Sequence, residues 1–330
     1  MNDRAVGLLE QYEIEVLRTR KGRGAIICDT DQGCLIFKEY TGNEDRIGIQ
    51  NRVLTHIREK GLVSAETILP TTEGALFVKD NDGVKYILKT YQEGRECNIH
   101  DKNECMEAVK LLAGLHESTK LPEEEVCQLP VFSQQKEYEK HNKELKKVRR
   151  YLQQKSQKTR FEITLLNSFD LFLQQALQLT DEWMQYQEMK DKESGEGESK
   201  IFCHGDYQYH NILRCEKGWF LINFEKCLID DPIRDLYLLL RKLLEKSSWS
   251  VAMGRELLEA YERERAISAF SRIDLYYRLA YPEKFWKIVN FYYNSGKAWI
   301  PERNGEKLEK VIIQEREKQQ FLEEVFQKLS

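Results

Sequence analysis

The segment Ile201-Phe-Cys-His204-Gly-Asp206-Tyr-Gln-Tyr-His-Asn211-Ile-Leu carries the most information about the fold. Its histidine stands two residues before the aspartate, and its asparagine follows five residues after the aspartate. Two short apolar runs then flank the turn Glu216-Lys217-Gly218, which predicts a β-hairpin. Because the two strands of a hairpin lie side by side, we expect Asn211 to lie next to residue 223.

This spacing is typical of a phosphotransferase catalytic loop, in which the aspartate accepts the proton of a substrate hydroxyl and the asparagine binds a metal ion. Asp206 and His204 are therefore the candidate catalytic residues, with Asp206 as the base. We expect His204 to orient the loop through hydrogen bonds and to transfer no proton. Asn211 is a candidate metal ligand, and residue 223 occupies the place of the second one.

The first 91 residues are predicted to form an antiparallel sheet with one helix. A helix is predicted from about Asn43 to Lys60, because apolar residues recur there at helical spacing and Gly61 follows. The run Asp80-Asn-Asp-Gly83 predicts a tight hairpin turn. The predicted strands are 13–18, 25–28, 34–38, 74–79 and 84–89.

The remaining residues, 92–330, are predicted to be mainly helical, with the hairpin inside segment 201–236 as the exception. A capping box at Asp101 and Glu104 predicts the start of a helix that ends near His116. The segment 138–160 is crowded with lysine and arginine, but glutamates interleave with them, so we interpret it as a solvated helix face.

The composition is that of a soluble globular protein, with 41% hydrophobic and 32% charged residues. A net charge of −4 provides no overall field that would attract nucleic acid. No apolar run approaches the ~20 residues of a membrane span, and the eight cysteines include no C-x-x-C pair typical of zinc or redox sites. Met1–Arg4 leads into acidic sequence without the apolar core of a signal peptide, so we expect cytoplasmic synthesis.

The segments Ile222-Asn223-Phe224-Glu225 and Asp231-Pro-Ile-Arg-Asp235-Leu complete a signature that resembles the aminoglycoside phosphotransferase and choline kinase superfamily. More narrowly, the chain resembles the CotS-type spore coat proteins. The resemblance implies an α+β, bilobal, protein kinase-like fold, with a small β-rich N-lobe (1–91) and a large helical C-lobe (92–330). The narrower resemblance rests on motifs in family order: Arg20-Lys-Gly-Arg-Gly24, Ile36-Phe-Lys38-Glu-Tyr40, Gln92-Glu-Gly-Arg-Glu96, Leu112-Ala-Gly-Leu-His116 and Tyr281-Pro-Glu-Lys-Phe-Trp-Lys-Ile-Val-Asn290.

The resemblance also implies nucleotide-binding positions among the first 91 residues. By position, Lys38 corresponds to the third-strand lysine that contacts the ATP phosphates; otherwise it is a solvated lysine at a strand end. Gly22 and Gly24 either cradle a phosphate or only close a hairpin. Gln50 stands on the apolar helix face where the glutamate partner of that lysine is expected, although Glu44 is an alternative partner.

Two residues depart from the superfamily pattern. Gln50 is neutral and cannot form the expected ion pair with Lys38. The aspartate expected before Phe224 is Asn223, so the metal site offers two neutral amides, Asn211 and Asn223. Since Mg²⁺ favours at least one anionic oxygen from the protein, we expect a weakened site for ATP and Mg²⁺.

The CotS resemblance implies a component of the spore coat, deposited from the mother-cell cytoplasm, whose partners are other coat proteins. In this hypothesis the kinase-like fold is a structural or interaction module, and Asn223 leaves it catalytically impaired. We expect Asp235 to brace the catalytic loop from the start of a helix and not to touch a substrate.

The alternative hypothesis is an active ATP-dependent small-molecule kinase. Asp206 would then be the base and Lys38 would contact phosphate. Mg²⁺ would be held by Asn211 together with a substitute carboxylate, either Glu225 or Asp230. The retained catalytic-loop residues favour this alternative, or at least residual nucleotide binding, whereas the amide at position 223 favours the coat hypothesis.

Overall fold

A computed structural model describes residues 3–22, 24–120, 133–193, 201–295 and 302–326 of the chain, without the side chains of 3–4 and 190–193. The chain forms two compact units. The first comprises 1–130, 200–239 and 260–265, and the second comprises 131–199, 240–259 and 266–330. In the described part of the chain, no helix is both long and apolar enough to cross a membrane.

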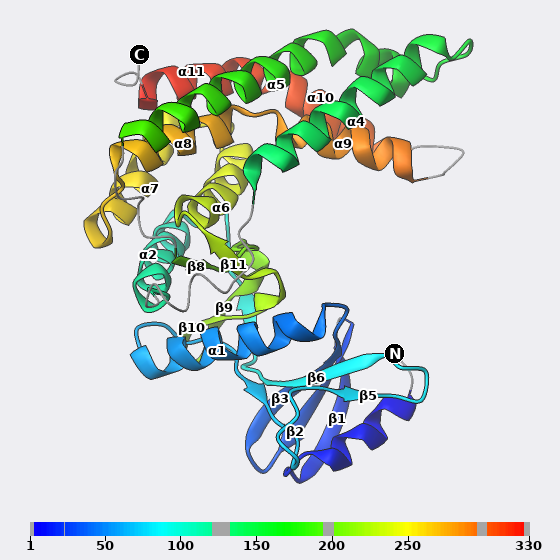
Figure 1. Ribbon diagram of the computed structural model, residues 1–330, viewed down its shortest axis with the longest axis vertical. Coiled ribbons are helices and arrows are strands. Elements are labelled where there is room, and N and C mark those ends of the chain that lie inside the picture. The colour runs from blue at the N-terminus through cyan, green and yellow to red at the C-terminus, as the bar shows by residue number, and fades with distance from the viewer. Residues whose placement is uncertain (1–2, 23, 121–132, 194–200, 296–301, 327–330) are drawn as a thin grey trace. The chain divides into compact units, whose positions relative to one another are not determined.

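The first unit begins with the short 3-10 helix η1 (Asp3–Gln11), followed by an antiparallel sheet (Figure 1). The strand order is β1-β2-β3-β6-β4, and β5 also pairs with β6. The strands are β1 (Val16–Gly22), β2 (Ala25–Thr30), β3 (Gly33–Glu39), β4 (Ile68–Leu69), β5 (Val78–Lys79) and β6 (Lys85–Thr90). The predicted strands are therefore present, but the first is shifted from 13–18 to Val16–Gly22, 74–79 is reduced to two residues, and β4 was not predicted.

The two faces of this sheet differ in chemistry. Leu35 and Phe37 of β3 and Leu88 of β6 pack with Leu9 of η1 in a small apolar core. Because side chains alternate along a strand, Lys38 points to the other face. The register pairs Lys38 with Ile87 and Ile36 with Lys89, so two lysines project from the same face of neighbouring strands.

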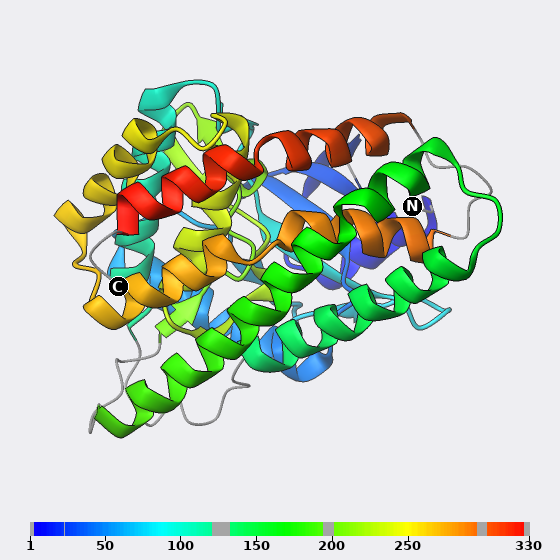
Figure 2. The same ribbon diagram turned by 90° about the horizontal axis from the view of Figure 1, so that it is seen from above.

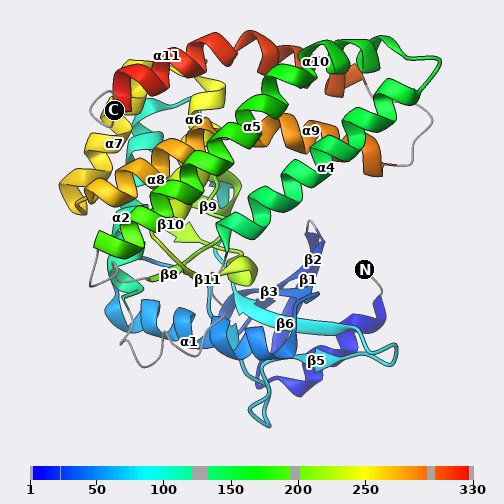
Figure 3. The ribbon, with the colours of Figure 1, turned by 45° about the horizontal axis from the view of Figure 1, so that its top comes forward.

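Helix α1 (Glu44–Lys60) follows the sheet strand that carries Lys38 and lies beside the sheet (Figures 1 and 3). The side chain of Asn43 accepts a hydrogen bond from the Asp45 N–H at the start of the helix, and Gly61, with φ 65°, caps its end. Its buried face consists of Ile47, Gln50, Val53, Leu54 and Ile57. The predicted helix is confirmed with its caps.

The rest of the first unit places the catalytic-loop-like segment between short strands. One small sheet has the order β10-β9-β7 and another pairs β11 with β8. Within the hairpin, Ile212 pairs with Leu221 and Cys215 with Gly218, as the sequence predicts. The elements are β7 (Gly94–Glu96), α2 (Lys102–Ser118), β8 (Ile201–Cys203), η2 (Tyr209–Asn211), β9 (Ile212–Cys215), β10 (Gly218–Leu221), η3 (Phe224–Lys226), β11 (Leu228–Asp230) and α6 (Ile233–Lys246).

The second unit is helical, and Figure 2 shows its long hairpin of α4 (Gln134–Gln154) and α5 (Arg160–Glu193). Its core contains rings from both halves, with Phe172 stacked on Phe285 at a centroid distance of 4.4 Å. The basic segment predicted as one helix over 138–160 is interrupted at 155–159. The other helices described are α7 (Val251–Glu264), whose residues from 260 on belong to the first unit, α8 (Ala269–Ala280), α9 (Glu283–Asn294), α10 (Glu302–Ile313) and α11 (Glu315–Phe326).

Candidate catalytic centre

The loop after β8 is fixed by backbone contacts to Asp235. The Asp235 carboxylate accepts hydrogen bonds from the backbone N–H groups of His204 (2.6 Å) and Gly205 (2.9 Å). Gly205 has φ 76°, and a Cβ there would lie 2.1 Å from the carbonyl oxygen of Lys226. Only glycine fits this close approach. These contacts support the expected bracing role of Asp235.

The His204 side chain is buried and uses both ring nitrogens within the loop. Its Nδ1 accepts a hydrogen bond from the Asp206 N–H at 3.2 Å. Its Nε2 lies 3.0 Å from the carbonyl oxygen of Ile222, to which it donates. Because both ring nitrogens are engaged in this way, the ring is held in one orientation, which supports the prediction that His204 orients the loop and transfers no proton.

The Asp206 carboxylate is already engaged by two side chains. Its Oδ1 accepts from the Gln208 amide at 2.5 Å, and its Oδ2 lies 2.9 Å from the ammonium of Lys226. Burial raises the pKa of Asp206, but the hydrogen bonds and charge of Lys226 and Gln208 outweigh it, so the pKa is lowered. Asp206 is therefore an ionised carboxylate that is able to accept a proton and is paired with Lys226.

The two amides proposed as metal ligands lie in contact, as the hairpin predicts. The Asn223 Nδ2 donates to the Asn211 Oδ1 at 2.8 Å. The Asn211 Nδ2 in turn donates to the carbonyl oxygen of Asp206 at 2.8 Å. Asn223 has the left-handed backbone conformation, with φ 67°, which asparagine tolerates better than most residues.

Lys38 reaches this group from the end of β3. Its Nζ donates to the Asn223 Oδ1 at 3.0 Å and lies 2.8 Å from the Glu225 Oε1. These contacts do not support the hypothesis that Lys38 is a solvated lysine at a strand end. Gln50 is buried, but neither of its amide atoms has a hydrogen-bond partner among the described residues. Glu44, the other suggested partner, pairs with Lys79 at 2.8 Å.

A buried ion cluster behind Lys38 was not predicted. Lys89 is fully buried, and its Nζ lies 2.7 Å from Glu66 and 2.9 Å from Glu225. Burial lowers the pKa of Lys89, but the two carboxylates raise it above its usual value. Burial raises the pKa of Glu225, but Lys89 and Lys38 lower it well below its usual range. The Glu66 carboxylate also accepts from the Phe224 N–H at 3.1 Å, so the cluster fixes the segment that carries Asn223.

Gly22 and Gly24 lie at the turn between β1 and β2, where Gly22 pairs with Ala25. Gly24 has φ 68°, a conformation that favours glycine in a turn, and a Cβ there would meet no other atom within 4 Å. The turn alone therefore accounts for Gly24. A role in cradling phosphate stays a prediction.

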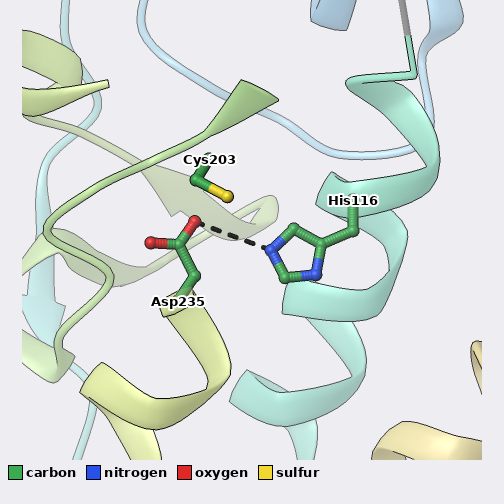
Figure 4. Close-up of side chains that lie close together, drawn as sticks. All are labelled: His116, Cys203 and Asp235. Carbon is green, nitrogen blue, oxygen red and sulfur yellow. Dashed lines mark ion pairs between the residues drawn. The ribbon is translucent and has the colours of Figure 1, made fainter. Parts of the chain in front are cut away.

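His116, Cys203 and Asp235 place three possible metal-binding side chains close together in a buried position (Figure 4). The His116 Nε2 lies 3.6 Å from Asp235, and its Nδ1 lies 2.6 Å from the Tyr261 hydroxyl. Burial raises the pKa of the Cys203 thiol well above its usual value, so this residue is a neutral thiol and not the thiolate that binds metals. Asp235, with His116 and Cys203 beside it, holds the catalytic loop in place, and we call this group the brace.

The donor atoms near Asn223 fit Mg²⁺ poorly. The Asn211 Oδ1 accepts from the Asn223 amide, the Asn223 Oδ1 accepts from Lys38, and the Asp206 Oδ2 is paired with Lys226. Each of these three oxygens is thus already bound to an N–H donor. Two of the three are uncharged, whereas Mg²⁺ in proteins is usually held by carboxylates and phosphates.

Comparison with solved structures confirms the expected fold. A solved aminoglycoside phosphotransferase from Alicyclobacillus acidocaldarius matches with a TM-score of 0.81 and 18% identity, covering 97% of this chain and 94% of that one. A spectinomycin phosphotransferase, solved in complex with ADP and spectinomycin, matches with a TM-score of 0.65 and 15% identity, over 94% and 97% of the two chains. The fold is therefore the α+β, bilobal, kinase-like fold of the aminoglycoside phosphotransferases.

The narrower resemblance is confirmed as well. Spore coat protein S of Bacillus subtilis (strain 168) is 25% identical over 320 residues, which are 93% of this chain and 88% of that protein. The profile of a family described as "Spore coat putative kinase YutH" matches residues 6–325. Since this match includes nearly every element described above, the chain belongs to this family of spore coat proteins with a kinase-like fold.

Proposed function

We propose that the protein is a component of the spore coat in which the kinase-like fold serves as a structural or interaction module, and in which phosphotransfer is impaired. Membership of a spore coat family supports the location. The interactions of Asn223 support the impairment. The partners in this proposal are other coat proteins, as the similarity to Spore coat protein S suggests.

The observation that carries the proposal is the hydrogen bond from Asn223 to Asn211. The Asn223 Nδ2 donates at 2.8 Å to the Asn211 Oδ1, which is the oxygen expected to bind metal. An aspartate at position 223 has no hydrogen to donate, so it would leave that oxygen available and add a negative charge. Metal ions supply several kcal/mol of charge stabilisation to phosphoryl transfer, so the amide is expected to reduce the rate by orders of magnitude.

Phosphotransfer and coat assembly should therefore respond differently to Asp206→Ala. We expect the purified protein to hydrolyse or transfer the ATP γ-phosphate no faster than this variant. In sporulating cells, we expect the variant to reach the coat in normal amount. Robust transfer by the wild-type protein that is abolished in Asp206→Ala would overturn the proposal.

The location is tested separately by fractionating sporulating cells. We expect the protein in the extracted spore surface layers and not in the vegetative cytosol. Recovery in vegetative cytosol alone would contradict the coat assignment, whatever the activity measurements show.

An active small-molecule kinase is the second candidate, because Asp206 is ionised and Lys38 lies at the same centre. The substitute carboxylates do not favour it. Glu225 is paired with Lys38 and with Lys89, and Asp230 lies 3.5 Å from Arg234. Calorimetry separates the candidates, since a working kinase should bind ATP much more tightly with Mg²⁺ than without it.

A further inference from the structure

The lysines and carboxylates that pair with one another at the candidate centre balance in charge. Three ammonium groups pair with three carboxylates. Lys38 and Lys89 both pair with Glu225, and Lys89 also pairs with Glu66. Lys226 pairs with Asp206. This set is neutral overall. Mg²⁺ beside a triphosphate is usually bound through one or two protein carboxylates together with the phosphates, whereas Glu225 and Asp206 are here already paired with lysines.

Two of these ammonium groups lie against oxygens of the centre, one on the candidate metal ligand Asn223 and one on the candidate base Asp206. The Lys38 Nζ lies 3.0 Å from the Asn223 Oδ1, and the Lys226 Nζ lies 2.9 Å from the Asp206 Oδ2. Asn223 and Asp206 belong to the two segments that bracket the metal in kinases. Positive charge is thus already present on both sides of this place, carried by side chains of the chain itself.

We propose that this centre binds the phosphate groups of a nucleoside triphosphate without a divalent cation, with Lys38 and Lys226 supplying the positive charge that Mg²⁺ would otherwise bring. The proposal goes beyond a role in the coat, because it assigns a ligand and a mode of binding. It rests on the altered metal site of the proposed function and does not depend on coat assembly.

Lys38 is suited to this role because its position is fixed in advance. An ammonium group has three N–H donors, and Asn223 and Glu225 accept from two of them. Its side chain is 23% exposed, so the third donor is available to a ligand. Glu225 is itself held by the buried Lys89, and a charge that is already held in place loses little side-chain entropy when a ligand binds.

Lys226 differs, since its side chain is 68% exposed whereas that of Asp206 is 17% exposed. A long exposed lysine can move from a carboxylate to a phosphate oxygen through rotation of its own side chain. Its contribution should fall as salt is added, because exposed charges are screened. Lys38, nearer the buried cluster, should be less sensitive to salt.

Calorimetry on the full chain tests the proposal with ATP as the probe, once in EDTA and once with excess MgCl₂. We expect ATP to bind in EDTA at least as tightly as with Mg²⁺. Lys226→Ala should weaken binding in EDTA by about tenfold, the effect of one charge-assisted contact. Lys217→Ala is the matched control, because Lys217 is an exposed lysine on the turn between β9 and β10, and it should leave binding unchanged.

Asn223→Asp should reverse the preference, weakening ATP binding in EDTA and strengthening it with Mg²⁺. Binding by the wild-type protein only with Mg²⁺ would overturn the proposal. Absence of ATP binding in both buffers would also overturn it, while a coat role without phosphotransfer would stand. Equal losses in Lys226→Ala and Lys217→Ala would contradict the assignment of Lys226. Thermal unfolding of each variant checks that it is folded.

Discussion

The catalytic loop has two sides that differ in how far they keep the chemistry of a kinase. On the brace side, Asp235 holds the backbone N–H groups of His204 and Gly205, and His116 lies behind it. His116, His204 and Asp235 are buried, and the contacts of Asp235 support the bracing role expected from the sequence. On the phosphate side, Asn223 replaces the expected aspartate and is held by a lysine. The shape of the loop and its affinity for metal therefore depend on different residues.

Differences in burial explain how the residue at position 223 can change while the brace around Asp235 stays the same. His204 and Asp235 are almost completely buried, so removing either leaves polar groups without partners and costs stability. Asn223 is only partly buried, and either an amide or a carboxylate can be solvated there or paired with Lys38. A chain can thus lose a metal ligand at this position and still keep the fold on which a structural role depends.

The largest effect is expected from Asp235→Ala. The change leaves the buried N–H of His204 and the partly buried N–H of Gly205 without an acceptor, which should lower the free energy of unfolding by about 3–5 kcal/mol. Urea unfolding of the first unit, followed by intrinsic fluorescence, measures it. Asp235→Asn keeps the shape and one acceptor oxygen, so its loss should be smaller. A loss below about 1 kcal/mol in Asp235→Ala would break the comparison, because the brace would then carry no stability.

Lys89→Met should have the next largest effect. It leaves Glu66 buried without its cation, while Glu225 retains Lys38, so we expect a loss of about 3 kcal/mol. Adding Glu66→Gln should recover part of that loss, since the uncompensated charge is then removed. If the two changes were simply additive, the pair would not act as a buried ion pair.

The sequence predicts the parts of this centre that depend on local spacing. The catalytic loop, the hairpin that joins Asn211 to Asn223 and the lysine at the end of β3 all follow from short patterns with a definite geometry. The helix predicted at 43–60 is marked by its own caps, Asn43 and Gly61. Each of these features is decided within about twenty residues of chain.

The buried ion cluster could not be predicted in the same way. Lys89 is separated from Glu66 by 23 positions and from Glu225 by 136, and a lysine at the end of an apolar strand is usually solvated. Its inward direction follows only from the register that pairs it with Ile36. Strands of three residues, such as β8 and β11, carry too little pattern to be recognised before their pairing is known.

Acid should weaken the brace progressively. Burial raises the pKa of Asp235, but its interaction with His116 and the backbone hydrogen bond from Gly205 lower it below its usual value, and burial lowers the pKa of His116. In the unfolded chain these side chains have their usual pKa values, about 6.5 for histidine and about 4 for aspartate. As the pH falls through each value, the unfolded chain therefore binds more protons than the folded one. Stability should be fully present near pH 7 and decrease as the pH falls through these values.

Thermal unfolding between pH 7.5 and 4 measures this decrease. His141 in the second unit contributes in the same direction, because burial lowers its pKa to about 4. The effect of His116→Gln is therefore measured in a chain that also carries His141→Gln, with the His141→Gln single variant as the reference. We expect His116→Gln to flatten the decline between pH 6.5 and 5. An unchanged decline would show that His116 does not provide the acid sensitivity of the brace.

The smallest effect on stability is expected from Asn223→Asp, and it most directly tests the difference between the two sides. The change removes the hydrogen bond to the Asn211 Oδ1, worth about 1 kcal/mol, but it places a carboxylate next to the Lys38 ammonium. These terms oppose each other, so the free energy of unfolding should change by less than about 1 kcal/mol. With ATP and Mg²⁺ present, however, the variant should gain thermal stability that the wild-type protein does not, because ligands that bind only the folded state raise the unfolding temperature. Asn223→Ala is the control: it also lacks the amide donor but brings no charge, so it should gain nothing from Mg²⁺. A loss of several kcal/mol in Asn223→Asp would instead mean that the phosphate side supports the fold as strongly as the brace does.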